Sequence, residues 1–144
     1  MIKKVIVLWG RANTGKSCTV KRVFELLTSS NLPDTQSDIM GILTTKADMI
    51  GIISQGDPNT MLRSRLSFLI RLGCTIIVCV TRGSGKTVEV VEALRERYKC
   101  RVMLWLRQNK EVRLKSQKRN NDVMAIRIVE EIERAVFWSI KIEA

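Results

Sequence analysis

The chain has 144 residues, a formal net charge of +11 and 45% apolar residues. This length is typical of one domain, so we expect residues 1–144 to form a single unit with its own hydrophobic core. No apolar run approaches the roughly 20 residues that cross a bilayer, and residues 5–9 are too short an apolar segment for a secretory signal. The four cysteines form no C-x-x-C pair and histidine is absent, which argues against a zinc site and favours a reducing, cytoplasmic location.

In the first half of the chain the sequence pattern predicts a strand, a helix and then a hairpin of two strands. Residues 3–9 are short, apolar and β-branched, which indicates a buried strand, and the pattern from 15 to 28 indicates a helix. A polar loop over residues 29–38 follows. Residues 39–45 and 49–55 are two β-rich runs joined by a short turn, which predicts an antiparallel hairpin.

The second half continues the alternation. We expect a helix over 61–73, a buried strand over 74–80, a helix that ends near residue 98, and a strand over 101–106. A last helix is predicted from about 121 to 140. Its apolar face is expected to contain Ile126, Val129, Ile132, Val136 and Ile140. Strands alternating with helices predict an α/β three-layer sandwich with a mostly parallel sheet and an antiparallel hairpin edge.

The segment Val5–Val20, VIVLWGRANTGKSCTV, contains the pattern G-x-x-x-x-G-K-[ST] between the first strand and the first helix. Gly10 lets the chain wrap tightly after the strand, and Gly15 is expected to let the backbone approach a ligand without a Cβ in the way. Amide N–H groups of about residues 13–18, at the positive end of a helix, suit a β-phosphate. Lys16 supplies a mobile charge for the β- and γ-phosphates, and the Ser17 hydroxyl is a hard ligand for Mg²⁺.

This motif resembles the Walker A motif of the P-loop NTPase superfamily, and the resemblance covers about residues 5–20. It implies a fold of the P-loop type, a bound nucleoside triphosphate such as ATP, and Mg²⁺. The residues that it implies for nucleotide binding are Gly10, Arg11, Ala12, Asn13, Thr14, Gly15, Lys16, Ser17 and Cys18.

Members of this superfamily usually place an aspartate after a neighbouring strand, where it holds Mg²⁺. The strand over 74–80 is followed by Thr81 and Arg82 and offers no acid, so Asp57 is the best metal ligand to join Ser17. Asp57 also suits a simple turn before a helix. Asp38 and Asp48 occupy loop positions around the hairpin and are weaker alternatives.

The choice of nucleotide depends on two further patterns. Gln55 resembles the glutamine that positions water in some P-loop hydrolases, and its place after the hairpin is similar to the order of elements in small GTPases. The guanine-reading N-K-x-D pattern is broken, because Val112 stands where the aspartate of Asn109-Lys110-Glu111 would follow. We therefore expect ATP in preference to GTP.

A second glycine turn, Thr81–Thr87, repeats the strand–turn–helix order but lacks the first glycine of the motif. Three roles stay open for it. It is a plain connection, or an anion site for an acceptor substrate, or a lid that brings Arg82 or Lys86 onto the transferred phosphoryl group.

Much of the positive charge lies in the basic stretch, Arg107–Arg127. It is either a solvated surface or a surface for a phosphorylated small molecule or nucleic acid, although no aromatic residue is interleaved there to stack on bases. Phe137 and Trp138 lie off the predicted apolar stripe of the last helix. They either pack on the sheet or pair two copies of the chain as a homo-oligomer.

Three functions fit these patterns. The first is an enzyme that transfers a phosphoryl group from Mg-bound ATP to a nucleotide or other small molecule, or hydrolyses ATP slowly, with Lys16, Gln55, Asp57, Arg82 and Lys86 in catalytic roles. The second is a nucleotide-dependent switch in which residues 55–60 respond to the γ-phosphate. The third is a basic protein that binds nucleic acid with little catalysis.

Overall fold

The computed structural model describes residues 2–11, 14–33, 38–54, 61–82, 85–109 and 113–143. For Lys86 and for residues 137–143 it describes the backbone alone. Within these ranges the chain is an α/β structure of five strands and four helices. In chain order the elements are β1 (Lys4–Trp9), α1 (Lys16–Thr28), β2 (Met40–Thr44), β3 (Met49–Ile53), α2 (Met61–Leu72), β4 (Ile76–Thr81), α3 (Lys86–Tyr98), β5 (Val102–Arg107) and α4 (Leu114–Glu143).

The strands form one sheet in the order β2-β3-β4-β1-β5. The pairs β3/β4, β4/β1 and β1/β5 are parallel, and β2 pairs with β3 antiparallel at the edge, which confirms the predicted hairpin edge. The register places Trp9 beside Thr81 on one neighbour and beside Arg107 on the other. The four parallel strands therefore end at one edge of the sheet, which we call the carboxyl edge.

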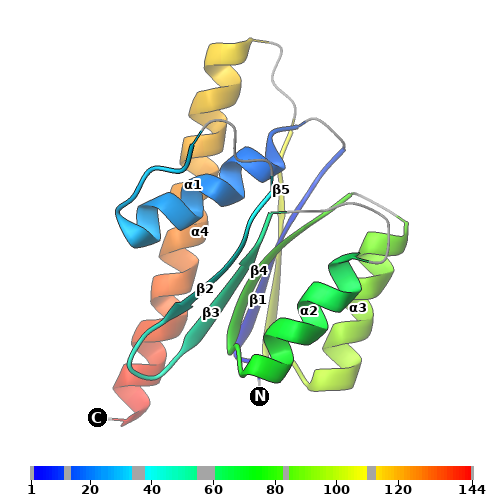
Figure 1. Cartoon of the computed structure of the whole chain (residues 1–144), viewed down its shortest axis with the longest axis vertical. Helices are drawn as coiled ribbons and strands as arrows, with labels where there is room; N and C mark the ends of the chain where they lie inside the picture. Colours follow the sequence, from blue (N-terminus) through cyan, green and yellow to red (C-terminus); the bar gives the residue numbers. More distant parts are fainter. Residues whose placement is uncertain are drawn as a thin grey trace.

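Helices cover both faces of the sheet, as predicted for a three-layer arrangement. Figure 1 shows α1 and α4 on one side and α2 and α3 on the other. Ile6 and Leu8 of β1 pack with α1 and α4, whereas Val5 and Val7 pack with α2 and α3. Because successive side chains of a strand point to opposite faces, a central strand covered on both sides has to be apolar throughout. This explains the uninterrupted apolar runs of β1 and β4.

The last helix differs from its prediction in two ways. It begins at Leu114 and not near residue 121, so the basic stretch is helical from Leu114 to Arg127. Its buried residues are Ala125, Ile128 and Ile132, and Ile126 is 50% exposed, so the predicted stripe is wrong at that position. The earlier start adds turns whose inward positions are polar, and periodicity in apolar residues alone does not detect such turns.

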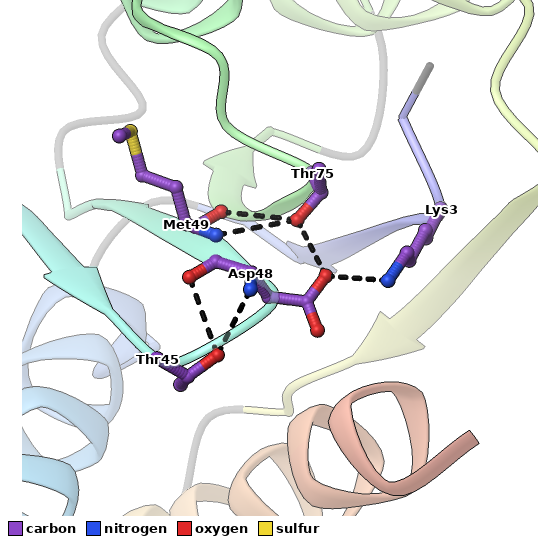
Figure 2. A network of polar contacts seen from close by, with 5 residues as sticks. All are labelled: Lys3, Thr45, Asp48, Met49 and Thr75. Atoms are coloured by element: carbon purple, nitrogen blue, oxygen red, sulfur yellow. Dashed lines mark hydrogen bonds and ion pairs between the residues drawn. The ribbon is translucent and has the colours of Figure 1, made fainter. Parts of the chain in front are cut away.

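The opposite edge of the sheet is closed by a polar network (Figure 2). Lys3 Nζ lies 2.7 Å from Asp48 Oδ1, and the Thr75 hydroxyl donates to the same oxygen over 2.8 Å. These residues immediately precede β1, β3 and β4, so Asp48 lies far from the carboxyl edge, and this argues against its weaker alternative role as a metal ligand there. In the described parts of the chain, no helix is both long and apolar enough to span a membrane.

Candidate functional site

The glycine-rich loop predicted from the sequence lies at the carboxyl edge, between the end of β1 and the start of α1. Gly10 and Thr14 are buried and Arg11 is exposed, while Ala12 and Asn13 lie outside the described residues. The Thr14 hydroxyl donates to the Arg11 carbonyl over 2.9 Å and holds the two sides of the bend together. The loop therefore leaves the central strand and enters a helix, as the motif requires.

Gly10 has to be a glycine because of packing against backbone, and Gly15 has to be one chiefly because of its backbone conformation. A Cβ at Gly10 would lie 2.4 Å from the Gln108 carbonyl oxygen, and one at Gly15 would lie 2.6 Å from Asn121 Oδ1. Gly15 also has a φ of +88°, in the left-handed region that side chains disfavour. Gly15 therefore lies close to α4, and the expectation that it also lets a ligand approach the backbone stays a prediction.

Three amide side chains hold the loop from behind, and we call them the loop bracket: Gln108, Gln117 and Asn121. The Nε2 groups of Gln108 and Gln117 each donate to the Thr14 carbonyl over 2.9 Å and to Asn121 Oδ1. The Thr19 hydroxyl lies 2.8 Å from Gln108 Oε1. Gln108 is only 1% exposed, so its amide group has to form hydrogen bonds within the protein. The loop bracket therefore fixes the position of the loop in the absence of a ligand.

Lys16 is buried at the start of α1, where it is 8% exposed. Its Nζ lies 2.6 Å from the carbonyl oxygens of Gly10 and Arg11. Burial, and then the nearby charge of Arg82, lower the pKa of this lysine below its ordinary 10.5. Among the described residues no carboxylate pairs with Lys16. Two positive charges therefore converge here, which an anion would stabilise.

The end of β3 lies against the first turn of α1. The Ser17 hydroxyl donates to the Ser54 carbonyl over 3.0 Å, and Ser54 Oγ lies 3.3 Å from Asp38 Oδ1. Asp38, the weaker alternative in the sequence, therefore lies close to the predicted metal ligand. Asp57 and Gln55 lie outside the described residues. Asp57 follows Ser54 by three positions, which limits their Cα separation to about 11 Å.

The end of β4 contributes two residues. Thr81 is fully buried beside Trp9, and its hydroxyl has no hydrogen-bond partner among the described residues. Arg82 is exposed, and its backbone N–H donates to the Thr87 hydroxyl over 3.2 Å, which closes this part of the second glycine turn. Lys86 begins α3, but its side chain is not described.

The exposed side of the loop opens into a hollow between α1 and α4, the α1–α4 hollow, of about 970 Å³. This volume is in the range of small-molecule sites. Cys18 lies there as an exposed free thiol. The lining includes Gly15, Cys18, Arg22, Leu32, Leu114 and Gln117.

Part of the basic stretch surrounds this hollow. Lys115 and Lys118 line it, and Arg22 forms ion pairs with Glu25 and Asp122 over 3.7 and 3.5 Å. The exposed cations of the stretch among the described residues are Arg107, Arg113, Lys115, Lys118, Arg119 and Arg127. From Leu114 to Arg127 the stretch is therefore a charged helix surface next to the loop.

Comparison of the chain with protein-family models, with curated proteins and with solved structures found no match in any of the three. The function has to be argued from the site. Sequence patterns predicted the loop, but they missed the loop bracket and Thr81. Gln108 could have been noticed, because a polar residue directly after a buried parallel strand lies at the same edge as the motif.

Proposed function

We propose that residues 10–18 bind the phosphates of a nucleoside triphosphate, ATP in preference to GTP, in complex with Mg²⁺, and that the chain transfers or slowly hydrolyses the γ-phosphoryl group. The observation that carries the proposal is the buried Lys16 ammonium at the start of α1, next to Arg82 and without a carboxylate partner among the described residues. Burying a charge is costly unless it is paired, so a site of this kind suits a polyanion.

The helix that follows the loop supports the same conclusion. The N-cap of α1 is Gly15, which has no side chain to accept from the first amides, and the first turn contains no acidic residue. The first backbone N–H groups of a helix lack partners within the helix, and the helix dipole adds a partial positive charge at this end. Phosphate oxygens would accept from these groups, as the motif predicts for the amides up to Cys18.

The residues at the end of β3 fit a magnesium ion. Ser17 offers a hydroxyl oxygen, and either Asp57 or Asp38 offers a carboxylate. Mg²⁺ prefers oxygen ligands and is commonly bound by one or two carboxylates together with water and phosphate oxygens. When bound, the ion neutralises charge on the β- and γ-phosphates.

Arg82 would act on the far end of the triphosphate. It is close enough to Lys16 to lower the pKa of that lysine, and it directly follows β4, the strand next to β1. An arginine there would stabilise charge that develops on the transferred group. Gln55 would orient water in a hydrolytic reaction, and Lys86 would add charge from the start of α3. Both of these roles remain predictions from the sequence.

The α1–α4 hollow supports a place for the nucleoside. Its lining includes Gly15 and Cys18, and neither Ser54 nor Arg82 is among the described residues that line it. If the γ-phosphate lies toward Arg82, the α-phosphate and the sugar leave the loop at Cys18 and enter this hollow. Apolar groups such as Leu32 and Leu114 and the polar amide of Gln117 suit a base.

Two alternatives compete with an enzyme. A nucleotide-dependent switch is supported by the Ser17–Ser54 contact, because residues 55–60 directly follow Ser54 in the sequence. Binding of nucleic acid is supported by the exposed cations on the first turns of α4. Measuring nucleic-acid affinity at increasing salt tests this second alternative, because binding through phosphate contacts weakens steeply as ionic strength rises.

The experiment uses the purified chain and three probes: inorganic tripolyphosphate, MgATP and MgGTP. Calorimetry should show that tripolyphosphate and MgATP bind one site, that MgATP binds more tightly than MgGTP, and that Lys16→Ala weakens all three. Product analysis with nucleosides and nucleotides as acceptors then separates transfer, hydrolysis and stable binding. Absence of binding by both tripolyphosphate and MgATP would overturn the proposal.

A further inference from the structure

A second hollow lies on the other face of the sheet, below α3, and contains two indole rings. We call it the indole hollow. Its volume is about 280 Å³, and it is lined by Trp9, Arg82, Val88, Glu92 and Trp105. Trp9 ends β1 and Trp105 belongs to the neighbouring strand β5, so both rings point to the same face. Val88 and Glu92 lie one turn apart on α3 and form the opposite wall.

Positive charge borders these aromatic rings. The Arg107 guanidinium lies 5.3 Å from the centroid of the Trp9 ring, and Arg82 belongs to the lining itself. In the sequence, Arg107 belongs to the basic stretch, where no aromatic residue is interleaved. Parallel pairing of β1 with β5 places Trp9 and Trp105 beside this charge. Aromatic faces combined with guanidinium groups are the combination that binds nucleotides by stacking.

We propose that the indole hollow binds one nucleotide unit, with its base against the tryptophan rings and its phosphate at Arg82. The small volume admits a single planar ring system, and the apolar walls of Trp9, Trp105 and Val88 suit its faces. Glu92 is the acidic group of the lining. It would repel the phosphate and accept a hydrogen bond from an exocyclic amino group, so cytosine and adenine should bind better than uracil.

Arg82 belongs both to this hollow and to the surroundings of Lys16. A unit bound in the indole hollow would thus place its phosphate near the end of any triphosphate held by residues 10–18. The binding itself does not depend on that triphosphate, so it is tested separately. A free mononucleotide and one nucleotide of a single-stranded nucleic acid both offer the base and the phosphate that this hollow would bind.

The test measures tryptophan fluorescence in a Trp138→Phe background, so that the signal comes from Trp9 and Trp105. The ligands are CMP, AMP, UMP and an eight-nucleotide single strand. We expect saturable quenching, with CMP and AMP binding more tightly than UMP. Arg82→Gln and Trp105→Leu should each weaken binding about fivefold or more. Trp105→Phe should retain part of the affinity, which guards against a folding defect in the leucine variant.

The controls separate this site from the phosphate loop. Arg71→Gln removes the same charge from the exposed last turn of α2, at the opposite edge of the sheet, and should leave quenching unchanged. Lys16→Ala should also leave it unchanged while abolishing binding of tripolyphosphate. If the eight-nucleotide single strand binds more tightly than the mononucleotides and its affinity falls with salt, the site belongs to nucleic acid. If the single strand and the mononucleotides bind equally well, the site belongs to free nucleotides. Absence of quenching, quenching that Arg82→Gln and Trp105→Leu do not affect, or quenching that Lys16→Ala abolishes would overturn the proposal.

Discussion

The Ser17 hydroxyl donates a hydrogen bond to the Ser54 carbonyl over 3.0 Å, and this contact joins the first turn of α1 to the end of β3. The two residues are 37 positions apart, and β4 lies between their strands in the sheet. It follows that the segment after Ser54, which contains Gln55 and Asp57, begins next to the predicted magnesium ligand.

Lys16→Ala should abolish most of the affinity for triphosphate and leave the fold intact. The lysine is buried with a lowered pKa, so its charge costs the apo protein free energy that a polyanion would offset. We expect at least a tenfold loss of MgATP affinity, equivalent to about 1.4 kcal/mol, and a change in the free energy of unfolding of about 1 kcal/mol or less. Lys46→Ala, on the exposed hairpin turn, is the control. Equal affinity in both variants would contradict the prediction.

Asp57→Asn and Asp38→Asn identify the carboxylate that holds Mg²⁺. We expect the metal-ligand variant to lower Mg²⁺-dependent activity or affinity far more than metal-free nucleotide affinity. Asp57 should show this pattern most strongly, and Asp38 should show it if the acid next to Ser54 is used instead. Calorimetry with and without Mg²⁺ measures the difference. If neither variant separates the two conditions, no carboxylate from this end of β3 binds the metal.

Thr81→Val should separate stability from function. The hydroxyl is buried without a partner among the described residues, and an unsatisfied buried group costs roughly 1–3 kcal/mol. The Thr81→Val variant should therefore unfold at a urea concentration equal to or higher than that of the unsubstituted protein. If the hydroxyl contacts bound ligand at the carboxyl edge, turnover or affinity for MgATP should fall at the same time. A loss of stability with unchanged binding would show that Thr81 has a purely structural role.

Gln108→Leu should loosen the glycine-rich loop. The Thr14 carbonyl and Asn121 would each lose a donor, and the Thr19 hydroxyl would lose an acceptor inside the protein. We expect a loss of about 1–3 kcal/mol in the free energy of unfolding, with weaker binding of tripolyphosphate. Asn120→Leu, which replaces the neighbouring amide of α4 that makes only a long contact of 3.4 Å, should change neither measurement.

The ion pair between Lys4 and Glu131 predicts a pH-dependent stability. The hydrogen bond from Lys4 holds the pKa of Glu131 below its ordinary 4.5. A carboxyl group with a lowered pKa in the folded state stabilises the fold above 4.5 and loses this contribution as the pH falls through the lowered value. Glu131→Gln should therefore cost about 1 kcal/mol at neutral pH and little in strong acid, measured by urea unfolding. The exposed Glu133→Gln should show no such difference.

Much of the fold follows from local patterns in the chain. The β1 run is apolar because an interior parallel strand is covered on both faces, so the strand can be predicted from local composition. The end of α2 can be predicted in the same way, because Gly73 follows the helix with a φ of +104°. The glycine-rich loop also follows from local pattern, since G-x-x-x-x-G-K-S specifies a turn and a helix start by local conformational preference.

Tertiary structure alone determined which distant residues surround that loop. Thr81 ends β4, Gln108 directly follows β5 and Asn121 belongs to α4. The hydrogen bonds that join Gln108 and Gln117 to Thr14 and Thr19 span 89 to 103 positions, and no periodic pattern marks a polar side chain with partners so distant. The same holds for Trp9 and Trp105, which lie on one face because β1 and β5 pair in parallel. Strand order follows from how helices pack over the whole sheet, and this packing energy is shared by all the elements at once.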